Sequence, residues 1–134
     1  MKIKVIDASV AVKWFLIEKK GREEALEVLE ELLNSPKSFA VPELFYYETL
    51  SVINKHLSSD SSVRELFRDL LSIGINRFSM CESLYMGVTK YQKLGLSGYD
   101  GAYAALAEDL GGEWLTFDKQ AHKIVKKLNI SRLL

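Results

Sequence analysis

Two aspartates come directly after predicted strands. Asp7 follows the apolar-leaning segment 2–6, and Asp118 follows the segment 113–117; both precede a predicted helix. In a parallel sheet, positions of this kind lie at the carboxyl ends of the strands, where ligands usually bind. We therefore expect both carboxylates at one edge of a sheet.

Two further acids can reach the same edge. Asp100 falls in the first turn of a predicted helix, and Glu48 lies on another helix with Leu44, Phe45 and Val52 at helical spacing around it. Burying an unpaired carboxylate on such an apolar face is costly. Glu48 is therefore expected to have a partner or a cation.

Four clustered carboxylates repel one another, so some would hold a proton unless a cation neutralised them. Mg²⁺ and Mn²⁺ suit such a cluster because hard cations prefer carboxylate oxygens. An ion held there can activate water and stabilise charge on a phosphoryl oxygen. The pattern predicts metal-dependent hydrolysis of phosphodiesters.

Each acid also has a simpler interpretation. Asp7 and Asp118 could be helix N-caps, Ser97-x-x-Asp100 matches a capping box, and Glu48 could point to solvent. Taken one at a time, the aspartates fit capping about as well as a site. Taken together, they favour the site.

Composition limits the alternatives. A single cysteine excludes an internal disulfide or a zinc cluster and favours a reducing compartment, so a cytoplasmic location is expected. No apolar run is long enough for a membrane helix. Lys+Arg and Asp+Glu both number 18, so the net charge of zero gives no support to nucleic-acid binding.

The elements alternate between strands and helices along the 134 residues, which fit one domain, 1–134. Strands are predicted over 2–6, 39–41, 75–80, 113–117 and 130–133, and helices over 9–16, 22–33, 43–57, 62–73, 82–94, 99–110 and 118–128. Pro42 is expected to stop the second strand, and Ser62 to cap the fourth helix. This order predicts an α/β fold with a parallel sheet covered by helices.

Four short motifs resemble those of PIN-domain nucleases, most closely the VapC-type toxins of prokaryotic toxin–antitoxin pairs. They are Val5-Ile6-Asp7-Ala8-Ser9, Pro42-Glu43-Leu44 with Glu48, Leu96-Ser97-Gly98-Tyr99-Asp100, and Leu115-Thr116-Phe117-Asp118-Lys119. Each motif alone is weak, but the four in order are fairly specific. Gly98 and Gly101 depart from the pattern, since bulkier or alanine-like residues are commoner there.

The resemblance implies a PIN-like three-layer sandwich with strand order 3-2-1-4-5. It also implies an Mg²⁺- or Mn²⁺-dependent endoribonuclease that acts on RNA, forms a homodimer and is blocked by a small antitoxin protein. By position, Asp7 and Asp100 would be the principal metal ligands, and Glu48 and Asp118 would complete the catalytic cluster.

Other residues could assist. By the same resemblance, Ser9 and Thr116 match places where a small hydroxyl lies near the metal waters. Lys13, Lys119 and Lys123 are candidate RNA contacts, although a solvated face is the commoner role for scattered lysines. Among the aromatic residues, Tyr99 and Tyr103 beside Asp100 could stack on a flipped nucleotide, but packing in the core is favoured. Tyr47 is likewise assigned to the core or to a dimer contact.

Three alternatives stay open. The first is a housekeeping PIN endonuclease for RNA maturation, which a neighbouring antitoxin gene would argue against. The second is a receiver-like acidic pocket, although receivers typically carry adjacent acids after the first strand and Asp7 stands alone. The third is a catalytically dead subunit. A phosphatase that requires Asp-x-Asp is excluded by Asp7-Ala8-Ser9.

Overall fold

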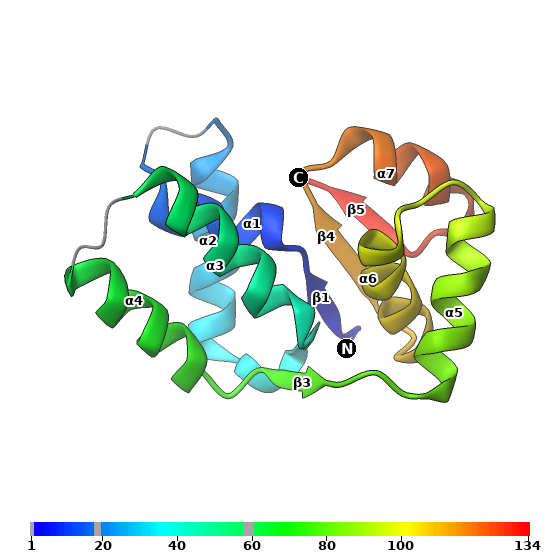
Figure 1. Ribbon diagram of the computed structural model, residues 1–134, viewed down its shortest axis with the longest axis horizontal. Coiled ribbons are helices and arrows are strands. Elements are labelled where there is room, and N and C mark those ends of the chain that lie inside the picture. Colours follow the sequence, from blue (N-terminus) through cyan, green and yellow to red (C-terminus); the bar gives the residue numbers. More distant parts are fainter. Residues whose placement is uncertain (1, 18–19, 58–60) are drawn as a thin grey trace.

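The computed structural model describes residues 2–17, 20–57 and 61–134 and contains one five-stranded sheet. The strands are β1 (Lys4–Ile6), β2 (Phe39–Pro42), β3 (Asn76–Phe78), β4 (Glu113–Thr116) and β5 (Ser131–Leu133). Their order is β3-β2-β1-β4-β5, and every neighbouring pair is parallel. The expected α/β class and strand order are confirmed (Figure 1).

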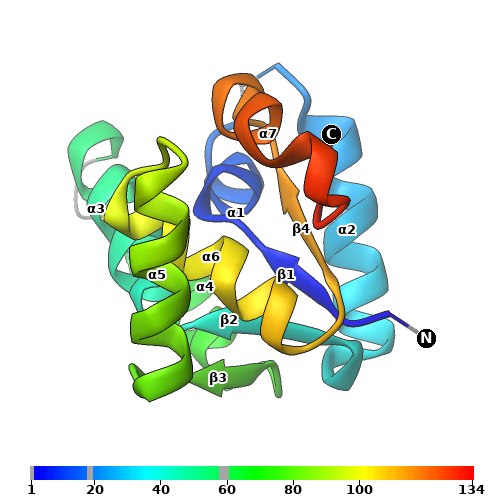
Figure 2. The same cartoon turned by 90° about the vertical axis from the view of Figure 1, so that its right-hand side faces the viewer.

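Helices cover both faces of this sheet. They are α1 (Ala8–Phe15), α2 (Arg22–Asn34), α3 (Leu44–His56), α4 (Ser61–Ser72), α5 (Glu82–Lys93), α6 (Gly98–Asp109) and α7 (Lys119–Val125), with short 3-10 turns η1 (Pro36–Ser38) and η2 (Lys126–Leu128). Figure 2 shows α5 and α6 on one side of the strands and α2 on the other. None of the helices in the described ranges is long and apolar enough to cross a membrane.

Two local predictions differ from the structure. β2 ends at Pro42, as expected, but it includes this residue, which lies opposite Phe78 of β3. Proline is tolerated there because the ladder continues through the next residue, whose N–H (Glu43) donates to the carbonyl of Phe78 at 2.9 Å. Ser62 does not cap α4, because the helix begins one residue earlier, at Ser61.

The helix that carries Asp100 is fixed by small residues. Six consecutive residues of α6, from Ala102 to Ala107, are buried, and α6 lies against β1, β2 and β4. On its other side α6 packs closely on α5: a Cβ added to Gly87 would lie 2.6 Å from the Cβ of Ala105. This packing sets the position of the first turn of α6 relative to the sheet.

Candidate active site

The carboxyl ends of β1 and β4 bring Asp7 and Asp118 to the same edge of the sheet. Ile6 is in register with Leu115, and the N–H of Asp7 donates to the carbonyl of Leu115 at 3.0 Å. Each aspartate is the N-cap of the helix that follows, α1 or α7. Both aspartates therefore cap a helix, and both also lie at the predicted edge of the sheet.

Asp7 is the most enclosed of the four acids, with 7% of its surface exposed. One carboxylate oxygen accepts from the N–H of Ser9 at 3.0 Å, and the other accepts from the indole N–H of Trp114 at 3.1 Å. Burial raises the pKa of Asp7 even though these bonds favour the charged form, and the charge of Asp118 adds to the rise. A nearby cation would remove this penalty.

Glu48 is half-buried on α3, and its partner is Tyr103 of α6. The Tyr103 hydroxyl donates to Oε1 of Glu48 at 2.8 Å. Burial raises the pKa of Glu48, the hydrogen bond opposes that rise, and the charges of Asp7 and Asp100 add to it. The prediction that this acid has a partner is confirmed.

Asp100 lies in the first turn of α6, half-buried, where its N–H donates to the hydroxyl of Ser97 at 3.0 Å. Burial first, and then the charges of Asp7 and Asp118, raise the pKa of the Asp100 carboxyl from 3.8 to about 6. Asp100 and Asp118 also line a common hollow of about 140 Å³ with Ser97 and Gln120. The other three acids thus lie close enough to Asp7 for their charges to repel its charge.

The exposed Asp118 sits on a turn held by two hydroxyls. Its side chain accepts from the N–H of Ala121 at 3.0 Å, while its own N–H donates to Oγ1 of Thr116 at 3.0 Å. The Ser9 hydroxyl accepts from the N–H of Phe117 at 3.1 Å. Ser9 and Thr116 therefore fix the backbone between β4 and α7, so they set where Asp118 lies.

Trp114 was not named in the sequence analysis, and Tyr103 was correctly assigned to the core without its role at the site. Their rings are stacked, with centroids 6.0 Å apart and planes 7° apart, and both side chains are fully buried. One donates to Asp7 and the other to Glu48. A buried tryptophan or tyrosine usually needs a partner for its polar atom. Applied to Trp114, which lies on a strand that ends at the site, this rule could have predicted a hydrogen bond to one of the acids.

The chemistry of the donors fits a hard cation, since the charged groups that act on Asp7, Glu48 and Asp100 are all carboxylates. Nevertheless, within residues 2–17, 20–57 and 61–134 no three His, Cys, Asp or Glu side chains converge as a ready-made metal site. The fit is therefore one of donor type and charge rather than of preformed geometry. At least one of the four side chains would have to move to share an ion.

The candidate RNA-contacting lysines lie near the turn that carries Asp118. The Nζ of Lys13 donates to the carbonyl of Lys20 at 2.6 Å and lies 4.4 Å from the centre of the Phe117 ring. Lys119 and Lys123 are exposed on α7, directly after Asp118. That these three lysines contact RNA stays a prediction.

Comparison with known proteins places the chain in a family. The sequence model of the PIN domain matches residues 4–127. Ribonuclease VapC3 of Pyrobaculum aerophilum is 26% identical over 124 residues, covering 87% of this chain and 89% of that protein.

Solved structures share the fold. A toxin–antitoxin complex from Klebsiella pneumoniae aligns with a TM-score of 0.72 at 18% identity, covering 96% of this chain and 95% of that chain. The Mycobacterium tuberculosis toxin VapC20, which cleaves the sarcin-ricin loop, aligns with a TM-score of 0.66 at 13% identity, covering 90% and 93%. Together with the sheet order and the four acids at its carboxyl edge, the family match shows that this chain belongs to the PIN domain family.

Proposed function

We propose that this protein is a metal-dependent endoribonuclease of the VapC type, which hydrolyses RNA phosphodiesters at Asp7, Glu48, Asp100 and Asp118. The observation that carries the proposal is the mutual repulsion of acids around Asp7. Burial and neighbouring carboxylates raise the pKa of Asp7, Glu48 and Asp100. A site that concentrates negative charge at such a cost is suited to a divalent cation.

Mg²⁺ or Mn²⁺, when bound, would supply Lewis-acid activation of water and stabilise charge on the phosphoryl oxygens. Asp7 and Asp100 would be the principal ligands, with Glu48 and Asp118 alongside. The protein holds these groups in place through its own bonds: Trp114 and Ser9 orient Asp7, and Tyr103 orients Glu48. Groups around a ligating residue commonly matter nearly as much as the ligand itself.

The proposal extends to partners. The name of VapC3 and the toxin–antitoxin complex among the structural neighbours support a small antitoxin as the protein partner. A homodimer and a cytoplasmic location belong to the same proposal. A neighbouring reading frame for a DNA-binding antitoxin would favour the toxin over a housekeeping PIN endonuclease.

The receiver-like alternative does not fit the fold. Receiver domains have the strand order 2-1-3-4-5, whereas this sheet has the order 3-2-1-4-5. The catalytically dead subunit is then the alternative that the experiment must address.

The test compares wild type with Asp7→Asn on a mixed RNA pool, with Mn²⁺ or with EDTA. Asparagine keeps the size of the side chain and removes its charge. Cleavage by wild type with Mn²⁺ only, lost in Asp7→Asn, is the expected result. Equal cleavage by both proteins would identify a contaminant, and no cleavage with any metal or RNA would favour the dead subunit.

A further inference from the structure

A second hollow lies beside the acids and has no role in the chemistry described so far. It has a volume of about 490 Å³ and is lined by Leu44, Tyr47, Glu48, Ser51, Val52 and Tyr99. Five of these residues come from α3, and Tyr99 comes from the first turn of α6, directly before Asp100. Because Glu48 lines the hollow and Tyr99 directly precedes Asp100, this space borders the acidic site.

The two tyrosines are held open to solvent. Tyr47 is 73% exposed and Tyr99 is 68% exposed. The prediction that Tyr99 packs in the core is therefore wrong, and of the two roles predicted for Tyr47 the core is excluded while a dimer contact stays a prediction. In the described part of the chain neither ring stacks on another aromatic ring. The helices that carry them are nevertheless fixed: α3 by the buried Phe45 and Ile53, and α6 by its run of buried small residues.

We propose that this hollow binds an unpaired nucleobase of the RNA, stacked on Tyr47 and Tyr99, beside the nucleotide whose phosphate reaches Glu48 and Asp100. The inference rests on the proposed nuclease function and names the part of the substrate that the site recognises. Aromatic side chains stack on any base through its π face, and the base must be unpaired for that face to be free. The hollow would therefore accept only a base that is unpaired at that position of the RNA.

The lining residues favour a base over a phosphate or a protein. Among the described residues, no lysine or arginine lines the hollow, so this lining offers no cation to a phosphate. The hydroxyl of Ser51 and the carboxylate of Glu48 can instead meet polar groups on the edge of a base.

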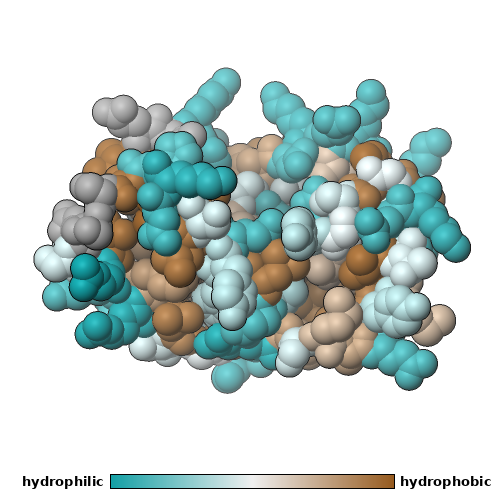
Figure 3. Space-filling model, viewed as in Figure 1, coloured by the Kyte–Doolittle hydropathy of each residue, from teal (hydrophilic) through white to brown (hydrophobic). Residues whose placement is uncertain are grey.

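The face shown in Figure 3 carries separate brown patches between teal ones rather than one continuous apolar surface. Large exposed apolar patches mark protein–protein interaction sites. This face therefore gives no such support to a protein as the occupant.

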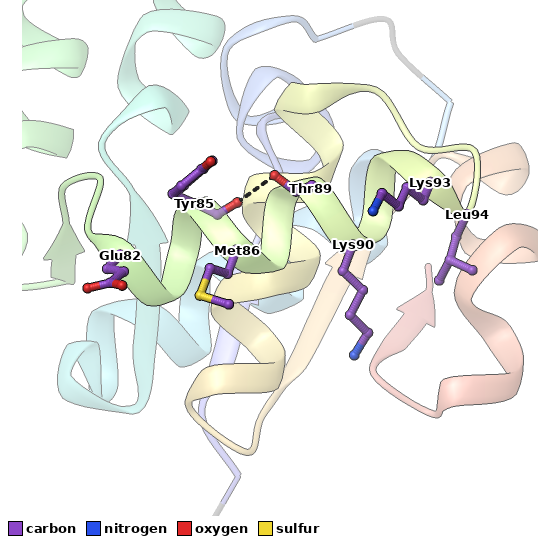
Figure 4. A pocket seen from close by; sticks show the side chains of 7 residues that line it. All are labelled: Glu82, Tyr85, Met86, Thr89, Lys90, Lys93 and Leu94. Carbon is purple, nitrogen blue, oxygen red and sulfur yellow. Dashed lines mark hydrogen bonds between the residues drawn. The ribbon is translucent and has the colours of Figure 1, made fainter.

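A matched control is available on α5. Tyr85 is 63% exposed and lines another hollow, together with Met86, Thr89 and Lys93, along that helix (Figure 4). None of the four acids lines it. Removing this ring changes exposed aromatic surface by a similar amount without touching the proposed base site.

The experiment measures anisotropy of a short fluorescein-labelled single-stranded RNA with Ca²⁺ in place of Mn²⁺, so that the phosphate beside Glu48 and Asp100 does not meet uncompensated carboxylates. A gel run afterwards checks that the strand is still intact. Tyr47→Ala and Tyr99→Ala should each weaken binding by about 5- to 100-fold. Tyr47→Phe and Tyr99→Phe keep the ring and should stay near wild type, as should Tyr85→Ala. A strand with abasic nucleotides, or a duplex, should bind wild type as weakly as the alanine variants bind the intact strand.

Wild-type affinity in both alanine variants, or no binding of the single strand by wild type, would overturn the inference. So would a change of oligomeric state without a change in RNA affinity, measured by light scattering, because the rings would then serve an interface between copies. RNA cleavage is measured separately. Cleavage without tyrosine-dependent binding would contradict only the proposed base site. Tyrosine-dependent binding without cleavage would contradict only the proposed nuclease function.

Discussion

Asp7 has two roles that usually belong to different residues, a helix N-cap and a member of the acidic cluster. It caps α1 through the N–H of Ser9, and it stands at the centre of the acidic cluster. Both of its oxygens already accept a hydrogen bond, so its orientation is fixed before any ligand arrives. Its position is therefore set by the fold, and its charge state depends on the surrounding groups.

The indole of Trp114 is predicted to act through Asp7. Trp114→Phe removes the N–H and keeps an aromatic ring against Tyr103; a lost bond to a carboxylate costs about 1.5–3 kcal/mol. RNA cleavage with Mn²⁺ should fall by roughly 10- to 100-fold, the range for groups that support a metal ligand. The control is Trp14→Phe, which also loses an indole N–H, here bonded to the carbonyl of Ala25 at 2.7 Å. It should lose stability but keep its activity per folded molecule; equal loss in both variants would contradict the prediction.

Asp100 should make the metal-free protein less stable as the pH rises. Its folded pKa of about 6 lies above its ordinary value of 3.8, so the folded chain keeps a proton that the unfolded chain has released. The free energy of unfolding therefore falls between about pH 4 and pH 6. Because Asp100 is only half-buried, solvent screening reduces the effect to about 1 kcal/mol.

Asp100→Asn should remove that part of the pH dependence. In EDTA the variant should match wild type near pH 4 and exceed it at pH 7, measured by chemical denaturation. Asp69→Asn, a change at an exposed acid of α4, should leave the wild-type pH profile intact. If wild type instead became more stable relative to Asp100→Asn as the pH rises, the pH dependence would have the opposite sign. That result would contradict a raised pKa of Asp100.

At the scale of elements, the sequence predicted most of what periodicity controls. The alternation of strands and helices, the aspartates after strands or in a first turn, and Glu48 on an apolar helix face were all found in this way. The end of β2 and the start of α4 were each misplaced by one residue. A proline fits both the last position of a strand and the position after it, and Ser61 and Ser62 are adjacent serines that could each begin the helix. The pairing of Tyr103 with Glu48, 55 residues away, and of Trp114 with Asp7, 107 residues away, depends on tertiary packing that no local pattern contains.

The contact between α5 and α6 is the second element-scale feature, and it should tolerate one glycine replacement but not the other. Gly87→Ala would bring a Cβ to 2.6 Å from that of Ala105, so a loss of about 1–3 kcal/mol is expected despite the better helix propensity. At Gly101 the nearest atom would be 3.4 Å away. Gly101→Ala should therefore gain up to about 1 kcal/mol.

Adding Ala105→Gly to Gly87→Ala should recover part of the lost stability, because it restores the space between the helices. Chemical denaturation of the four proteins in EDTA measures these differences. If Gly87→Ala were as stable as Gly101→Ala, close packing would not be what positions α6.

For the whole molecule, the acids come from four places between residues 7 and 118, and only the folded chain brings them together. An ion bound among them would stabilise the folded state alone. At a concentration near a hundred times its dissociation constant, this adds about 2.7 kcal/mol. For a chain of this size that corresponds to a rise in Tm of roughly 10 °C.

We therefore expect Mn²⁺ to raise the Tm of wild type and of Asp69→Asn, but not that of Asp7→Asn, in a thermal unfolding series with increasing Mn²⁺. The comparison is made within each protein, with and without the ion, because Asp7→Asn changes the metal-free stability as well. Asparagine offers one acceptor oxygen to the two donors that Ser9 and Trp114 supply. An equal rise in all three proteins would mean that the ion binds elsewhere. No rise in any of them would leave the acids without their cation, and the repulsion around Asp7 would then be relieved by protons instead.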